Sequence, residues 1–146
     1  ANPFAVEEIA EALKGVDKTI IIKNPIHPDI NAWAGAVERL NKVKVKQIIL
    51  VHRGFYTGRS SEYRNEPIWT IPIKMKRKFP NNLLLCDPSH ISGDHKLVYK
   101  ISREAILKYC MDGLMIETHI NPDNSLSDQN QQIVPVELKH ILNRLY

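Results

Sequence analysis

The chain of 146 residues is long enough for one domain, and its apolar content of 43% is enough to build a core. No apolar run approaches the roughly eighteen residues that a membrane span needs, so we expect no membrane segment. The net charge of +4 is mild, and the basic run at residues 74–78 reads as the solvated face of a helix. Since no stretch interleaves aromatic with basic residues, we expect no nucleic-acid partner.

The start of the chain and its cysteines predict the compartment. The first fifteen residues, ANPFAVEEIAEALKG, are polar and acidic rather than basic and then apolar, so we expect no secretory signal. Cys86 and Cys110 both follow apolar residues, which predicts reduced thiols in the core. Together these features predict a cytoplasmic protein.

The first predicted element is a helix over residues 2–15, with Asn2 as its N-cap, Pro3 in its first turn and Gly15 at its end. Strands and helices then alternate to the end of the chain. In order, they are strand 19–23, helix 28–43, strand 46–55, helix 67–79, strand 82–87, helix 102–111, strand 113–118 and helix 135–146. We expect long loops at residues 53–66 and 88–101.

The predicted strands are apolar throughout instead of alternating between apolar and polar residues. Such strands are typically buried on both faces, as in a parallel sheet covered by helices. No linker or low-complexity segment divides the sequence. We therefore predict an α/β fold in a single domain that spans residues 1–146.

Each predicted strand ends in polar, reactive residues: KNP, HRGF, CDPSH and IETH. In parallel α/β folds the carboxyl ends of the strands and the loops after them build the active site. The two long loops follow two of these strands, as expected around a substrate site. The sequence therefore predicts a functional site at this end of the sheet.

Two cations among these tails suit an anionic substrate. Arg53 offers a planar fork of donors that fits phosphate or carboxylate, although a structural ion pair is an equal alternative. Lys23 ends its strand, where a lysine more often only extends its ammonium group into solvent.

A second group of residues suits a divalent metal ion. His90 and Glu117 follow predicted strands, and Asp128 lies in the loop beyond Glu117. A histidine with carboxylates is a typical ligand set for a transition metal. Each has an ordinary alternative: a hydrogen-bonded histidine, a carboxylate paired with lysine or arginine, and a loop or capping aspartate.

The same strings resemble those of a known enzyme family. KNP, HRGF with YRN ten residues on, CDPSH, and DGLMIETH followed by NPDNSLSD are similar, in this order, to the type I 3-deoxy-D-arabino-heptulosonate 7-phosphate (DAHP) synthases. The resemblance is greatest to the branch related to 3-deoxy-D-manno-octulosonate 8-phosphate synthase. It implies a parallel barrel of the TIM type, of which this chain matches strands five to eight.

The resemblance also implies roles for individual residues. His90, Glu117 and Asp128 would be three of four ligands to a divalent metal ion, one of Mn, Fe, Co or Zn. Lys23 would hold the carboxylate of phosphoenolpyruvate and move a proton, which makes Lys23 and His90 the implied catalytic residues. The implied substrate-binding residues are Lys23, Arg53, Arg64 of YRN, Asp87 of CDPSH and His52. The reaction would join phosphoenolpyruvate to erythrose 4-phosphate, the first step toward the aromatic amino acids.

Half of the family pattern is absent from this chain. The GPCS stretch, which carries the fourth metal ligand, the KPR stretch and the GART arginine do not occur in it. A complete barrel needs ~250 residues. We therefore expect the C-terminal half of a barrel, inactive alone, that either requires a missing N-terminal half or associates as a homo-oligomer.

Two other functions remain open at this point. One is the octulosonate phosphate synthase, whose usual DATH stands against CDPSH here. The other is a non-catalytic half-barrel that serves as a binding or assembly module.

Overall fold

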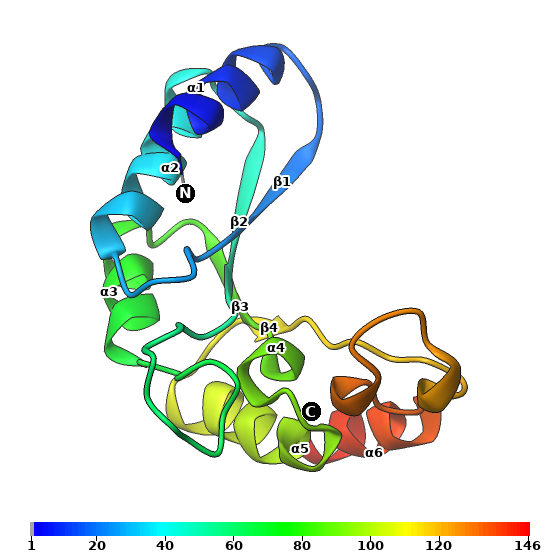
Figure 1. Cartoon of the computed structure of the whole chain (residues 1–146). Coiled ribbons are helices and arrows are strands. Elements are labelled where there is room, and N and C mark those ends of the chain that lie inside the picture. The colour runs from blue at the N-terminus through cyan, green and yellow to red at the C-terminus, as the bar shows by residue number, and fades with distance from the viewer. Residues whose placement is uncertain (1) are drawn as a thin grey trace.

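A computed structural model describes residues 2–146 and shows one sheet of four parallel strands (Figure 1). The strands are β1 (Thr19–Lys23), β2 (Gln47–His52), β3 (Leu83–Cys86) and β4 (Gly113–Leu114), in the order β1-β2-β3-β4. All four predicted strands exist, and their parallel arrangement is confirmed. The ladder of β4 is shorter than the predicted 113–118, because its neighbour β3 ends at Cys86 and the chain then turns into a helix.

Six α-helices accompany the sheet within residues 2–146. They are α1 (Pro3–Ala12), α2 (Ile30–Lys42), α3 (Thr70–Lys78), α4 (Pro88–Ser92), α5 (His95–Arg103) and α6 (Pro135–Leu145). A π-helical turn, η1 (Glu104–Lys108), continues α5, and two short 3-10 turns, η2 (Pro122–Asn124) and η3 (Gln129–Gln131), lie between β4 and α6. The predicted N-cap Asn2 is confirmed, since its side chain accepts a hydrogen bond from the Phe4 N–H.

The prediction of a loop over residues 88–101 is wrong, because this stretch forms α4 and most of α5. Asp87 and Asp94 cap the two helices, accepting hydrogen bonds from the backbone N–H groups of His90 and Lys96. Gly93, with φ of 67°, makes the turn between them. Aspartate N-caps followed directly by proline or histidine were a sequence signal for these helices. The loop predicted over 53–66 has no helix or strand, as expected.

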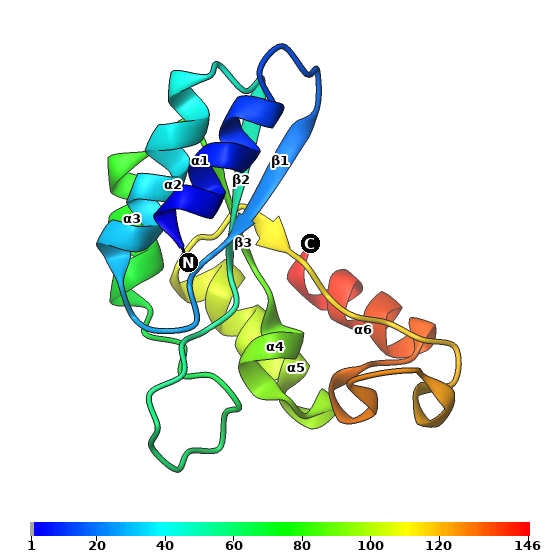
Figure 2. The same ribbon diagram turned by 45° about the horizontal axis from the view of Figure 1, so that its top comes forward.

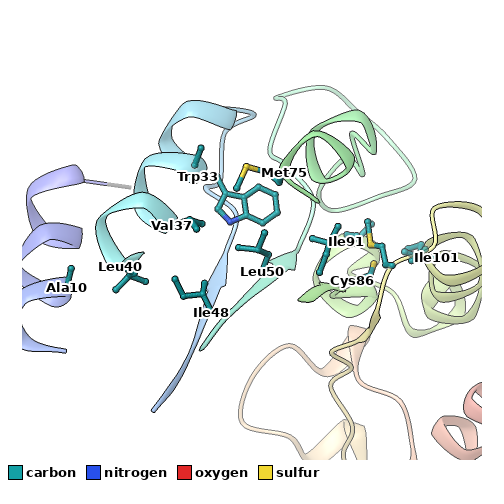
Figure 3. Packing of buried hydrophobic residues seen from close by; sticks show 14 residues of the cluster. Ala10, Trp33, Val37, Leu40, Ile48, Leu50, Met75, Cys86, Ile91 and Ile101 are labelled. Atoms are coloured by element: carbon teal, nitrogen blue, oxygen red, sulfur yellow. The ribbon is translucent and has the colours of Figure 1, made fainter. Parts of the chain in front are cut away.

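The core lies between one face of the sheet and the helices α1, α2 and α3, which run along it in Figures 1 and 2, and it continues to α4 and α5 through Ile91 and Ile101. Figure 3 shows Trp33, Leu50 and Met75 packed together at its centre, and all three are almost fully buried. The apolar face predicted for helix 28–43 is thus confirmed by Trp33 and Val37.

The second face of the sheet is not covered within residues 2–146, contrary to the prediction that both faces are buried. Ile21 of β1 is 48% exposed and Leu83 of β3 is 41% exposed. In the strand register Ile21 lies beside Ile49, and Ile49 beside Leu83, so the three form an apolar row across the sheet. The strands therefore have apolar residues on both faces of the sheet, but only one face is covered by helices of this chain.

The cysteines differ from the prediction in one respect. Both thiols are free, but only Cys86 is in the core, and Cys110 is exposed at the turn after η1. Burial raises the pKa of the Cys86 thiol well above its usual value, which keeps it neutral. Among residues 2–146, no helix combines the length and the apolar character needed to cross a membrane.

Candidate functional site

The carboxyl ends of β1 and β3 bring together a lysine and a buried aspartate. Lys23 Nζ lies 2.8 Å from Asp87 Oδ2; the Lys23 side chain is 38% exposed, but that of Asp87 only 1%. The parallel register places the end of β1 near the end of β3, with β2 between them. A carboxylate this deeply buried needs a cationic partner, and Lys23 supplies it.

Asp87 also positions His90. One carboxylate oxygen, Oδ1, accepts the backbone N–H of His90 at 3.0 Å, and Oδ2 lies 2.8 Å from the ring Nδ1. The ring N–H is not aimed closely at that oxygen, so the second contact is a close approach rather than a well-formed hydrogen bond. Burial alone would raise the pKa of Asp87, but the contacts with His90 and Lys23 outweigh it and hold the pKa below its usual value.

The other ring nitrogen of His90 faces Glu117, which follows β4. Nε2 lies 3.6 Å from Glu117 Oε1, and the backbone N–H of Glu117 donates to Ser89 Oγ at 3.0 Å. Ser89 and His90 both belong to α4, so this short helix holds the tail of β4 in place. Metal-binding histidines commonly direct one ring nitrogen at a carboxylate, as His90 does at Asp87, and use the other nitrogen for the metal.

The third predicted metal ligand is paired with an arginine. Asp128 Oδ1 lies 2.7 Å from Arg64 Nη1, and this contact lowers the pKa of Asp128. Within residues 2–146, no group of three His, Cys, Asp or Glu side chains is arranged to hold a metal ion. The structure thus places the His90 ring opposite the Glu117 carboxylate, whereas the Asp128 carboxylate is paired with Arg64. The nitrogen and oxygen donors present fit a divalent metal chemically, with two of the three already facing each other.

Gln131, which the sequence reading missed, joins these groups. Its side chain is almost fully buried, donates from Nε2 to Glu117 Oε2 at 2.8 Å, and accepts from Arg64 Nη1 at 2.9 Å. Glutamines in a polar loop are common, and only the fold shows that this one reaches the end of β4.

Two glycines let the chain bring Arg64 to this position. Gly54 and Gly93 both have positive φ, and a Cβ on either would lie within 2.8 Å of Asn65 or Arg64 atoms. The backbone N–H groups of Arg64 and Asn65 donate to α4 carbonyls, and Asn65 Nδ2 donates to the His90 carbonyl at 2.7 Å. The long loop after β2 is therefore fastened to α4 at the two residues next to the site.

Arg53 stands at the end of β2 with its backbone fixed by Asn24. The Asn24 side chain accepts from the Arg53 N–H at 2.7 Å and donates to the Gly54 carbonyl at 2.8 Å. Within the described residues, the Arg53 guanidinium has no ion pair or hydrogen bond, which leaves its donors available to an anion. Asn24 was also missed, although its place directly after a strand was a signal.

His52, the remaining predicted substrate residue, lies on the other side of the sheet. It is fully buried among the rings of Phe55 and Trp69, and neither ring nitrogen has a hydrogen-bond partner within residues 2–146. Desolvation lowers the pKa of His52 to about 3, against a smaller opposite effect of Asp87. Side chains alternate along a strand, so His52 faces the helices with Leu50, whereas Arg53 faces the other way.

This burial predicts an acid-sensitive fold. Unfolded, the imidazole binds a proton below pH about 6.5, but in the folded chain only near pH 3, so stability falls as the pH drops between these values. His52→Leu should remove that loss. We expect the free energy of unfolding in urea to be higher for the variant than for the unsubstituted chain, and this difference to be about 2 kcal/mol larger at pH 5 than at pH 8. An equal difference at both pH values would contradict it.

Apart from a hollow of about 480 Å³ lined by His27, Tyr56 and Arg59 in the loops after β1 and β2, the described surface has two hollows of similar size. One, of about 450 Å³, lies beside the contacts of Arg64 with Asp128 and Gln131 and is lined by these three residues, together with neighbouring loop residues. The other, of about 440 Å³, lies between α5 and α6, where His95 and Arg144 are exposed, away from the strand ends. The chemistry gathered at the strand ends favours the first as part of the candidate site.

Comparisons with known proteins bear on the family and the fold of the chain. The model of the DAHP synthetase I family matches residues 6–145. The phospho-2-dehydro-3-deoxyheptonate aldolase of Thermotoga maritima is 30% identical over 117 residues, which cover 80% of this chain and 34% of that protein.

Two solved structures from Thermotoga maritima share the fold. A truncated form of 3-deoxy-D-arabino-heptulosonate 7-phosphate synthase has a TM-score of 0.82 at 24% identity, covering 98% of this chain and 52% of that one. A crystal structure of phospho-2-dehydro-3-deoxyheptonate aldolase has a TM-score of 0.84 at 24% identity, covering 99% of this chain and 40% of that one.

The predicted α/β architecture of a TIM-type half-barrel is thereby confirmed. The chain spans between about a third and about half of the length of these relatives. Because the family model covers nearly its whole length, the chain belongs to the DAHP synthetase I family.

Proposed function

We propose that this chain forms the C-terminal half of a barrel that condenses phosphoenolpyruvate with erythrose 4-phosphate to give DAHP. The observation that carries the proposal is the continuous contact from Lys23 through Asp87 and His90 to Glu117 at the carboxyl ends of three parallel strands. Family membership supports the reaction, and the half-barrel length supports the idea that the chain alone is inactive.

In this proposal the cations hold phosphoenolpyruvate. The guanidinium of Arg53 binds its phosphate, and Arg64 provides a second cation from the neighbouring loop. Lys23, fixed by Asp87, pairs with the carboxylate and can pass a proton. Asp87 is too deeply buried to meet a substrate directly, so its role is to orient Lys23 and His90.

His90, Glu117 and, once freed from Arg64, Asp128 would hold a divalent metal ion, which would polarise the aldehyde of erythrose 4-phosphate. C3 of phosphoenolpyruvate forms the new bond to the aldehyde carbon, water adds to C2, and phosphate leaves. The cationic side chains stabilise the negative charge that develops on the reacting groups.

A chimeric barrel tests the function. Residues 1–146 would replace the matching segment of the Thermotoga maritima DAHP synthase, and both consumption of phosphoenolpyruvate and formation of DAHP would be measured. We expect the chimera to be active and the 146-residue chain alone to be inactive. The same chimera carrying Arg53→Lys should lose at least tenfold in kcat/KM for phosphoenolpyruvate, because a point charge cannot replace a fork of donors.

The outcomes separate the alternatives. A folded but inactive chimera would favour a non-catalytic assembly module. A chimera that prefers a five-carbon sugar phosphate, and so makes an eight-carbon product, would favour the octulosonate phosphate synthase. Activity of the chain alone would contradict the claim that it needs the other half.

A further inference from the structure

The Gln131 side chain separates two groups of opposite charge. Its amide nitrogen donates to Glu117 and its amide oxygen accepts from Arg64, at 2.8 and 2.9 Å. The guanidinium and the carboxylate are therefore only one amide group apart. Gln131 is almost fully buried, so water does not compete freely for these contacts.

Without this amide, Arg64 and Glu117 would be free to pair. Arg64 uses Nη1 for both Asp128 and Gln131, and a guanidinium carries five N–H donors, so others remain for a second carboxylate. An arginine bridging Asp128 and Glu117 would neutralise two of the three carboxylate and imidazole donors proposed for the metal. It would also occupy a cation proposed for the substrate.

A side-chain amide suits this place. A carboxylate here would repel Glu117, an amine or guanidinium would repel Arg64, and an apolar side chain would satisfy neither. The amide satisfies the donor on one side and the acceptor on the other without a charge of its own.

We propose that Gln131 is a positioning residue that keeps Arg64 from pairing with Glu117. Glu117 thereby stays available to a divalent cation beside His90, and Arg64 stays available to an anion. This inference rests on the proposed function, because it assumes that these residues serve a metal ion and an anionic substrate.

Titration of the chimeric barrel with Mn²⁺, measured by calorimetry, tests the inference without any assay of activity. Gln131→Met should weaken Mn²⁺ binding by tenfold or more, as is typical when a group behind a metal ligand is lost. The double variant Gln131→Met with Arg64→Met should recover affinity to within about threefold of Arg64→Met alone, because no arginine remains to pair with Glu117.

The matched control is Gln132→Met, since the neighbouring amide donates only to the Ser127 carbonyl at 3.1 Å and should not affect Mn²⁺ binding. If Gln131→Met does not fold, Gln131→Asn keeps a buried amide that is too short to reach both partners, and the same tenfold loss is expected. Equal affinities of the Gln131→Met chimera and the unsubstituted chimera would overturn the inference alone. A loss that Arg64→Met does not reverse would show a merely structural role and also overturn it. Absence of Mn²⁺ binding by the unsubstituted chimera would overturn the metal site and this inference together.

Discussion

Replacing Lys23 by methionine should destabilise the chain by about 2 kcal/mol in urea unfolding at pH 7. The substitution leaves the Asp87 carboxylate, whose side chain is 1% exposed, with His90 as its remaining side-chain partner. Breaking a fully buried ion pair costs about 3–5 kcal/mol. The smaller value expected here, about 2 kcal/mol, allows for the 38% exposure of the Lys23 side chain. Methionine keeps most of the length of the lysine, so the loss reports on charge rather than on packing.

The control is Lys46→Met, which removes a pair of similar length at the surface. Lys46 Nζ lies 2.8 Å from Asp17, but the two side chains are 69% and 74% exposed. Such pairs contribute about 0–1 kcal/mol. If Lys23→Met costs no more than Lys46→Met, Lys23 is only reaching for water, as strand-end lysines often do. Adding Asp87→Asn to Lys23→Met should recover part of the stability, because the buried charge disappears as well.

The same pair carries a pH dependence. Because contacts with His90 and Lys23 hold the folded pKa of Asp87 below its unfolded value of about 4, the pair stabilises the fold above that pH. That stability is lost as the pH falls through the folded pKa. The destabilisation caused by Lys23→Met should therefore be full at neutral pH and should shrink as the pH falls below about 4.

The sequence predicted those parts of the fold that depend on local chemistry. Continuous apolar strands and helix-capping residues such as Asn2 and Pro135 gave the alternation of strands and helices. The start of α5 was missed because His95 and Lys96 follow two helix-capping aspartates and a glycine that resemble a loop. The open face of the sheet was missed because strand composition shows what a face can bury, not what this chain provides to bury it.

The same distinction applies to the site. Lys23, His90 and Glu117 could be found because parallel strands end together. The structure links Lys23 to His90 through Asp87, and His90 faces Glu117. The orientation of His52 could have been predicted from side-chain alternation, since adjacent residues of a strand, such as His52 and Arg53, point to opposite faces of the sheet. Gln131 could not be found, because its contacts depend on how a loop far along the chain folds back.

The open face leads to the last prediction, which concerns self-association. Ile21, Ile49 and Leu83 form an apolar row across the sheet, and Ile21 and Leu83 are about half exposed at 48% and 41%. In the described residues β1 pairs only with β2, so its other edge has free N–H and C=O groups. Exposed apolar strands with a free edge favour pairing with another chain.

We therefore expect light scattering and sedimentation to show that the 146-residue chain associates, through this face, with a second copy. Ile21→Lys should weaken the association at least tenfold, because burying a lysine in an apolar contact costs more than the roughly 1.4 kcal/mol that a tenfold change represents. Ile120→Lys is the matched control: Ile120 is 85% exposed, but it lies in the loop after β4 and not on the sheet, so its replacement should leave the association unchanged. A chain that stays monomeric at high concentration would show that the uncovered face is stable in water. Equal effects of the two substitutions would show that this face does not govern how the half-barrel finds a partner.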